Sequence, residues 1–306
     1  VGYFAPGPFP AAELAAGDVG YIATGLKNIG DCRVGVTVTT LKDGAAAPLV
    51  SYVPPKPMVF AGIYATQGEE YPELREAIEK LRLNDASLTY EPESSPILGH
   101  GFRCGFLGLL HMDIVRERLE REFQLSLIVT VPAVEYIVTV AGDRQITVVN
   151  PTDLPPPAEI VKIEEPWVKI SIITPSVFIG ALMEFVIAAG GIYKRTEYLG
   201  QYRGGSELGQ RVLLEYEVPL RSMLTMFYDN LKSRSRGYAS LDYEFIAFRD
   251  ARLVKLDVLI NNVTVDAFSR IIPREQAHEV GKAVVDKLNE TIPRQLFKVP
   301  IQAAVG

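Results

Sequence analysis

Apolar and polar residues alternate in short runs along residues 1–55. The clearest run is Val34–Thr40, with valine at every second position. Turn-forming residues separate the runs, as in Lys27–Gly30 and Lys42–Gly44. This alternation predicts β-strands, so we expect a partial β-barrel, because the segment is too short to close one. The prolines of Ser51–Pro57 then predict a stiff linker.

Residues 56–140 combine strands with a helical period. In Tyr71–Leu83 apolar residues recur every three or four positions, which predicts a helix that buries Leu74, Ala77, Ile78 and Leu81. The order β-α-β-β-α-β predicts a first ferredoxin-like domain. The other expected elements are strands at Met58–Ala65, Ser87–Glu91, Gly101–Cys104 and Leu125–Val131 and a helix at Leu107–Phe123.

The same order recurs in residues 166–250, which predicts a second ferredoxin-like domain. We expect its strands at Trp167–Ile173, Tyr193–Tyr202, Arg211–Val218 and Tyr238–Phe248, and its helices at Val177–Ala189 and Arg221–Ser233.

Two further segments complete the predicted organisation. The prolines of residues 141–165 predict a connector between the two ferredoxin-like domains. Residues 251–306 predict an α+β C-terminal segment, with a strand at Leu253–Ile260, a helix around Gln276–Leu288 and a strand near Phe297–Gln302. The predicted fold class is therefore α+β: a partial β-barrel, two ferredoxin-like domains and an α+β C-terminal segment.

The composition is that of a folded protein. Hydrophobic residues make up 48% of the 306 residues and charged residues 22%, which excludes disorder as the main state. No apolar run is long enough to predict a transmembrane segment. Two cysteines cannot form a disulfide framework, so a reducing cytosol fits best. The first residue is Val1 instead of methionine, which leads us to expect a piece of a longer protein.

The charge is unevenly distributed. The net charge of −6 divides into −9 for residues 1–165 and +3 for the remainder, so a surface that binds a polyanion is expected in the second half. The candidate for RNA binding is the end of a predicted amphipathic helix. Cations there complement the helix dipole, but they would equally face phosphates, with serine hydroxyls as further donors, and the residues alone leave both interpretations open. The candidate residues are Lys232, Ser233, Arg234, Ser235, Arg236 and Gly237.

Two other motifs fail on inspection. Gly204–Arg211 has the glycine spacing of a phosphate loop, but Gln210 stands where that loop requires lysine. Arg236–Tyr243 resembles an RNA-recognition octapeptide, but Ser240 occupies a position of a base-stacking aromatic residue. No nucleophile with its base, pair of acids or metal-ligand set is present. We expect no catalytic residue, cofactor site or metal site in this chain.

Six segments resemble those of one family, LepA, also called elongation factor 4, whose members are translational GTPases. The likeness extends over practically the whole chain, whereas elongation factor G resembles it only in outline. The segments are Leu83–Leu88, Tyr90–Glu93, Gly101–Ile114, Ser235–Tyr243, Ile292–Gln295 and Ile301–Gly306.

The resemblance implies a domain plan. Residues 1–55 would correspond to elongation-factor domain II, residues 166–250 to domain V of elongation factor G, and residues 251–306 to the start of a LepA-type C-terminal domain. We therefore expect the chain to lack the N-terminal GTP-binding domain and the end of the C-terminal domain. GTP and Mg²⁺ are the cofactors implied for the full-length parent, a GTPase, and the chain alone should be inactive.

The resemblance also implies a role in protein synthesis, either back-translocation of tRNAs on the ribosome or ribosome assembly. The expected partners are the ribosome, through ribosomal RNA, and tRNA. In the family the second ferredoxin-like domain contacts ribosomal RNA, which would place Lys232–Gly237 at the RNA. We expect a monomer that binds no DNA and is cytoplasmic, with peripheral association at the inner face of the cell membrane, or an organelle, left open.

One alternative belongs to a different functional class. Paired ferredoxin-like domains are shared by many proteins and say little about function. The chain would then be a stand-alone regulatory protein that binds a small ligand between these two domains.

Overall fold

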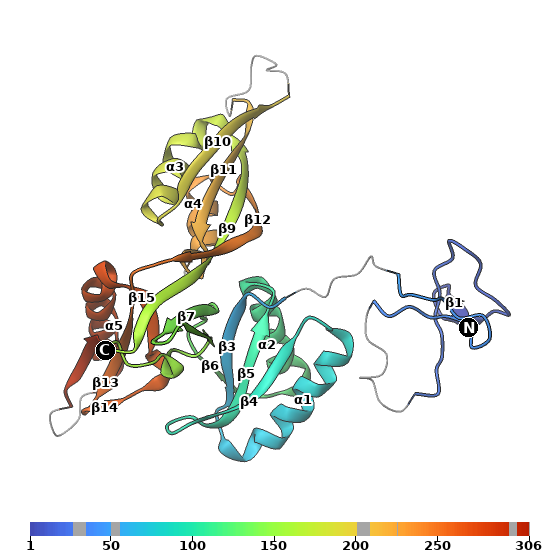
Figure 1. Cartoon of the computed structure of the whole chain (residues 1–306), viewed down its shortest axis with the longest axis horizontal. Helices are drawn as coiled ribbons and strands as arrows, with labels where there is room; N and C mark the ends of the chain where they lie inside the picture. Colours follow the sequence, from blue (N-terminus) through green and yellow to red (C-terminus); the bar gives the residue numbers. More distant parts are fainter. Residues whose placement is uncertain (27–34, 50–55, 201–208, 225, 294–298, 306) are drawn as a thin grey trace. The chain divides into compact units, whose positions relative to one another are not determined.

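The computed structural model describes residues 1–26, 35–49, 56–200, 209–224, 226–293 and 299–305 (Figure 1). The chain is mixed α+β, and each of its sheets is antiparallel. It divides into two compact units, Val1–Pro55 with Leu83–Ala86, and Lys56–Arg82 with Ser87–Gly306. No helix among the described residues is both long and apolar enough to cross a membrane.

Strand content near the N-terminus is lower than the alternation predicts. Strands β1 (Gly2–Phe4) and β2 (Pro8–Pro10) pair with each other. Gly35–Thr40 forms no strand, and the side chains of Val36 and Val38 are exposed, so the prediction is wrong there. Alternation stabilises a strand only through cross-strand partners, which this local pattern does not supply. The predicted turn at 27–30 and residues 51–55 of the predicted linker lie outside the described residues.

The first large sheet has the order β4-β5-β3-β6. Its strands β3, β4, β5 and β6 are Val59–Ala65, Thr89–Ser95, Gly99–Phe106 and Leu127–Val129. Helices α1 (Tyr71–Asn84) and α2 (Leu109–Phe123) share one hydrophobic core with it. The predicted buried face of α1 is confirmed, because Leu74, Ala77, Ile78 and Leu81 are all buried. The element order along the chain is β-α-β-β-α-β.

The second large sheet is organised by one long strand, β9 (Ile160–Pro175). Its first residues pair with β7 (Tyr136–Val140), and the remainder pairs with β11 (Arg211–Pro219) on one edge and β12 (Ser240–Asp250) on the other. Figure 1 shows β9 as one continuous arrow. With β10 (Ile192–Leu199), strands β9 to β12 have the order β10-β11-β9-β12, which repeats the strand order of the first sheet.

Residues 141–165 are not the simple connector that their prolines predict. They contain β8 (Arg144–Val148), which forms a hairpin with β7, and the start of β9. The loop of this hairpin is the three residues 141–143, since Val140 pairs with Arg144, and Gly142 and Asp143 in it have positive φ, 85° and 56°. Three-residue hairpin loops commonly include a residue with left-handed backbone. The proline-rich part is confined to the short segment between β8 and β9.

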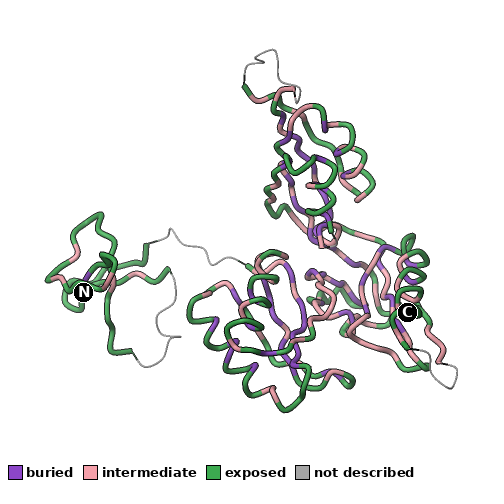
Figure 2. Tube along the Cα trace, turned by 180° about the vertical axis from the view of Figure 1, so that it is seen from behind, coloured by how far each residue is buried: buried purple, intermediate pink, exposed green. Residues whose placement is uncertain are grey.

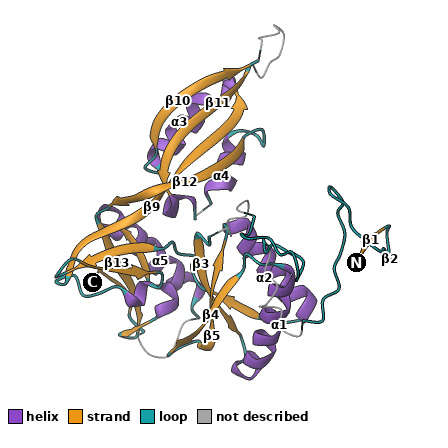
Figure 3. Cartoon of the chain, turned by 45° about the vertical axis from the view of Figure 1, so that its right-hand side comes forward, coloured by secondary structure: helices purple, strands orange, loops and turns teal. Residues whose placement is uncertain are grey.

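Helices α3 (Ile179–Ala188) and α4 (Phe227–Arg234) cover one face of this sheet (Figure 3). Leu182, Val186 and Leu231 are fully buried against the alternating apolar residues of β9 and β11. Figure 2 shows these strands buried and the outer faces of the helices exposed. The helix predicted from Arg221 is wrong at its start, because Met226 has a φ of 49° and α4 begins only after it.

The C-terminal segment forms a smaller four-stranded sheet around β13 (Leu253–Ile260), whose predicted bounds are confirmed. Helix α5 (Ala277–Thr291) packs against it closely at Gly281, where an added Cβ would lie 2.9 Å from the side chain of Ala303. The other strands, β14, β15 and β16, are Val263–Thr264, Arg270–Pro273 and Ile301–Val305.

Ion pairs cover the face of the second sheet opposite α3 and α4. The carboxylate of Glu215 on β11 forms ion pairs with the guanidinium of Arg195 and, at 2.8 Å, with the ammonium of Lys169. These two cations lower the pKa of the Glu215 carboxyl to about 2. The guanidinium of Arg249 lies 4.6 Å from the ring centre of Trp167 on β9. Because Trp167 is the single tryptophan of the chain, its fluorescence reports on this sheet.

We predict that Glu215→Gln destabilises this sheet by an amount that depends on pH. A carboxyl whose folded pKa is depressed contributes stability above its ordinary value of 4.5 and loses it as the pH falls toward about 2. The variant should therefore be less stable than the parent at neutral pH, and the deficit should shrink at about pH 3. Urea midpoints followed by Trp167 fluorescence measure it.

The matched control is Glu79→Gln on α1, whose carboxylate pairs with Arg75 in an exposed position. Exposed pairs contribute little, so this variant should leave the Trp167 transition unchanged. A Glu215→Gln deficit of equal size at both pH values would contradict the account.

Candidate nucleic-acid interface

The basic tip, Lys232–Gly237, closes helix α4 with three cations and no acidic residue. The side chain of Lys232 is half-buried, whereas those of Ser233, Arg234 and Arg236 are exposed. Cations at this end also complement the helix dipole. The structure thus brings the predicted cations together at one exposed helix end.

The backbone of the basic tip forms a Schellman-type helix end. The amide of Gly237 donates to the carbonyl of Lys232 at 2.7 Å, and the amide of Arg236 donates to that of Ser233 at 3.3 Å. This motif requires left-handed backbone at the residue after the cap, where glycine is usual. Here that residue is Arg236, with a φ of 49°, and Gly237 follows with a φ of 84°.

An arginine in left-handed conformation is unusual, because its Cβ crowds the following carbonyl oxygen. Such conformations persist where the surroundings impose them, and they cluster at functional sites. Within the described part of the chain the guanidinium of Arg236 has no ion pair or hydrogen bond. Arg236 is therefore the member of the basic tip most open to an external anion.

Ser235 corrects one part of the prediction. Its side chain is fully buried and its hydroxyl donates to the carbonyl of Leu231 at 2.8 Å, while the amide of Ala239 donates to that hydroxyl at 3.0 Å. Both bonds lie inside the protein, so the hydroxyl is unavailable as a donor to phosphate. Sequence spacing alone could not distinguish it from Ser233, which is exposed.

Aromatic rings hold the two other cations of the basic tip. The ammonium of Lys232 lies 5.4 Å from the ring centre of Tyr228 and donates to the carbonyl of Gly237 at 3.3 Å. The guanidinium of Arg234 lies 5.2 Å from the ring centre of Phe185 on α3. Cation–π contacts orient a charge without neutralising it, so both side chains keep their full positive charge.

Sequence reasoning missed two neighbours of the basic tip. Arg211 pairs with Pro175 in the sheet, and Ser240 pairs with Ile173, so the exposed Arg211 lies at the same end of the sheet as the start of β12. Tyr238 is 54% exposed and stacks on Phe178. A cation at the same end of the sheet and an aromatic ring directly after the basic tip are groups that bind RNA phosphates and bases.

The two rejected motifs lie where neither could act as the sequence pattern suggests. Gly200–Gln210 joins the antiparallel strands β10 and β11, whereas a phosphate loop joins a strand to a helix. Residues 201–208, which include residues 204–208 of this motif, lie outside the described residues. The octapeptide-like segment runs into β12, which follows the second helix of its unit. Among the described residues no three histidine, cysteine or acidic side chains gather as a metal would require.

Comparison with known proteins connects this geometry to translation factors. Residues 162–259 match the family described as elongation factor G C-terminus, and residues 260–306 match the family described as GTP-binding protein LepA C-terminus. Elongation factor 4 of Dehalococcoides mccartyi strain BAV1 is 65% identical over 305 residues, which is 100% of this chain and 50% of that protein. Over its whole length the chain is similar to elongation factor 4.

A second relative matches the chain over the same span. Elongation factor 4 of Clostridium botulinum strain Hall is 53% identical over 306 residues, again 100% of this chain and 50% of the relative. The chain thus spans about half the length of the elongation factor 4 relatives it matches. A crystal structure of a protein from Thermus thermophilus can be superposed on this chain with a TM-score of 0.42 and 15% sequence identity. The superposition includes 67% of this chain and 42% of the other.

The basic tip lies inside the segment that matches the elongation factor G C-terminus. We predict that Ser235→Ala lowers the free energy of unfolding of this part of the chain by about 1–3 kcal/mol, because the amide of Ala239 loses its buried acceptor. Ser233→Ala, two residues away and exposed, should change it by less than about 0.5 kcal/mol.

Urea unfolding followed by Trp167 fluorescence compares the two serine variants. Equal stabilities for both would show that the Ser235 hydroxyl has no capping role.

Proposed function

We propose that this chain is the ribosome-binding portion of a LepA-like translational GTPase, and that its basic tip contacts ribosomal RNA. The observation that carries the proposal is the 65% identity to an elongation factor 4 over the whole chain. The basic tip adds a physical reason, since three unneutralised cations on a preformed helix end suit adjacent phosphates. The net charge of −6 argues that contact with nucleic acid is local.

We further propose the finer domain plan. Residues 1–55 correspond to part of the domain II barrel, 56–140 and 166–250 to two ferredoxin-like domains, and 251–306 to the LepA-type C-terminal domain. The repeated strand order β4-β5-β3-β6 and β10-β11-β9-β12 supports the two ferredoxin-like assignments, because both sheets are antiparallel and each carries two helices on one face.

The cofactors GTP and Mg²⁺ belong in this proposal to the parent protein. The residues of this chain do not fit a nucleotide, because Gln210 replaces the lysine of a phosphate loop. Its side-chain amide instead donates to the carbonyl of Gly200, within the connection between β10 and β11. Nucleotide hydrolysis is therefore assigned to residues outside this chain, and the chain itself to binding.

The parent would act in the cytoplasm, as a monomer, where ribosomes and tRNA are its partners. Its contribution would be to back-translocation or to ribosome assembly. Both roles require the same physical property of this chain, an attachment to ribosomal RNA that salt weakens.

Charge reversal tests the proposal. We predict that Lys232→Glu, Arg234→Glu and Arg236→Glu together weaken co-sedimentation of the chain with ribosomes. The dependence of log K on log salt should become shallower by about three units, one for each lost phosphate contact. The measurement is sedimentation across a salt series.

The control reverses the same number of charges on helices α1 and α2, by Arg75→Glu, Lys80→Glu and Arg121→Glu. These side chains are exposed and paired with glutamates on their own helices, so their loss should cost little stability. Equal weakening by both sets would mean that only overall charge matters, and it would refute the assignment of the basic tip.

Arg236→Gly separates binding from folding. Glycine relieves the left-handed strain at this position, so stability should be unchanged or higher by up to about 1 kcal/mol. Ribosome binding should nevertheless weaken, with a salt dependence shallower by about one unit. Unchanged binding would remove Arg236 from the interface.

A further inference from the structure

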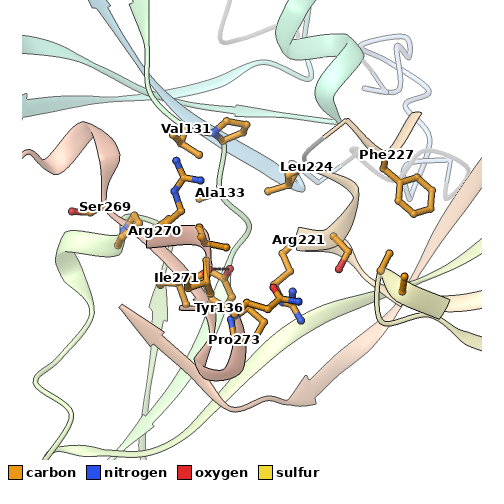
Figure 4. Close-up of a pocket in the computed structure, with 18 of the residues that line it drawn as sticks. Val131, Ala133, Tyr136, Arg221, Leu224, Phe227, Ser269, Arg270, Ile271 and Pro273 are labelled. Carbon is orange, nitrogen blue, oxygen red and sulfur yellow. Dashed lines mark hydrogen bonds between the residues drawn. The ribbon is translucent and has the colours of Figure 1, made fainter. Parts of the chain in front are cut away.

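A cavity of about 380 Å³ lies within the larger unit, and no residue of the basic tip lines it (Figure 4). The segment between β6 and β7, helices α3 and α4 and strand β15 all contribute to it. Its volume is within the range of sites that bind small molecules, about 300–1,000 Å³. Its apolar wall includes Val131, Ala133, Phe185, Leu224, Phe227 and Ile271.

One charged group in the described part of this wall has no ion-pair partner. Arg270, at the start of β15, lines the cavity, and its Nε atom is buried without a hydrogen-bond partner. No carboxylate of the described residues pairs with its guanidinium. Burial lowers the pKa of Arg270, but a guanidinium remains protonated in proteins. The cavity therefore contains a half-buried cation whose Nε atom has lost water and gained no protein acceptor.

Three other polar groups of the wall are already engaged. Arg221 pairs with the buried Glu165 at 2.5 Å. The hydroxyl of Ser269 donates to Asp257 at 2.7 Å, and that of Tyr136 donates to the carbonyl of Ile271 at 3.4 Å. No aspartate or glutamate is among the described residues that line the cavity. The wall thus carries one uncompensated positive charge among apolar side chains.

We infer that this cavity binds a small amphipathic anion, whose carboxylate pairs with Arg270 and whose apolar body contacts Val131, Leu224 and Phe227. An unpaired buried donor costs free energy, and an anionic acceptor that fills the site recovers it. The apolar wall favours a ligand with a hydrocarbon body over inorganic phosphate. This site goes beyond the proposed ribosome binding and does not use the basic tip.

The two halves of the ligand are tested with decanoate and decanol, which share a hydrocarbon chain and differ in charge. Isothermal titration calorimetry on the whole chain should show saturable binding of decanoate and at least about tenfold weaker binding of decanol, since a charge-assisted bond is worth about 1.5–3 kcal/mol. Equal affinity for both would refute a role for the guanidinium. Absence of saturable decanoate binding would overturn the site.

Two variants separate the site from general affinity for fatty acids. Arg270→Met keeps a similar length of apolar side chain without the charge, and it should weaken the binding of decanoate at least about tenfold. Arg274→Met is the matched control, because Arg274 is exposed just beyond β15 and is not among the lining residues. Similar losses for both variants would contradict the proposal.

Cavity filling gives a test that does not depend on Arg270. Ala133→Leu narrows the space and leaves the guanidinium in place, so decanoate should bind more weakly although the charge is retained. Thermal unfolding without ligand checks that each variant folds. The Arg270→Met variant should co-sediment with ribosomes as strongly as the unmodified chain. Loss of decanoate binding can therefore be told apart from loss of the proposed ribosome binding.

Discussion

Strand β9 is the constraint on which the larger unit depends. Every backbone amide and carbonyl of a buried strand needs a partner, and β9 finds its partners in three different strands. Ile170, for example, pairs with Tyr216 of β11 on one side and with Tyr243 of β12 on the other. The register of this one strand fixes which residues of β11 and β12 enter the core, and it thereby sets where α3 and α4 pack.

The position of the basic tip follows from the same constraint. Leu231 is buried under the sheet and Ala239 precedes β12, so the chain must leave α4 and enter β12 within a few residues. A tight helix end with Ser235 inside and Arg236 in left-handed backbone meets this requirement. The result is a compact group of cations whose orientation is set by the fold, which lowers the entropy lost when a phosphate binds.

Local patterns predicted what is local. The buried face of α1 and the bounds of β13 follow from periodicity and are confirmed. The hairpin loops at 141–143 and Asn261–Asn262 show their positive φ only in the structure. Residues 35–40 of the strand expected at 34–40 form no strand, because alternation alone cannot provide cross-strand partners. Within the basic tip, sequence identified the cations. The burial of Ser235 and the ring beneath Arg234 depend on distant elements, so no local pattern could reveal them.

The most direct test places a radical source at the basic tip. An iron chelate attached to Ser233→Cys cleaves RNA within a short radius, in a background with Cys32→Ser. Cys104 stays unreactive, because it is buried and its thiol pKa is raised to about 12. The account predicts discrete cleavage of ribosomal RNA that unlabelled chain competes away. Cleavage from a chelate at Asn84→Cys on α1 together with none from position 233 would contradict it.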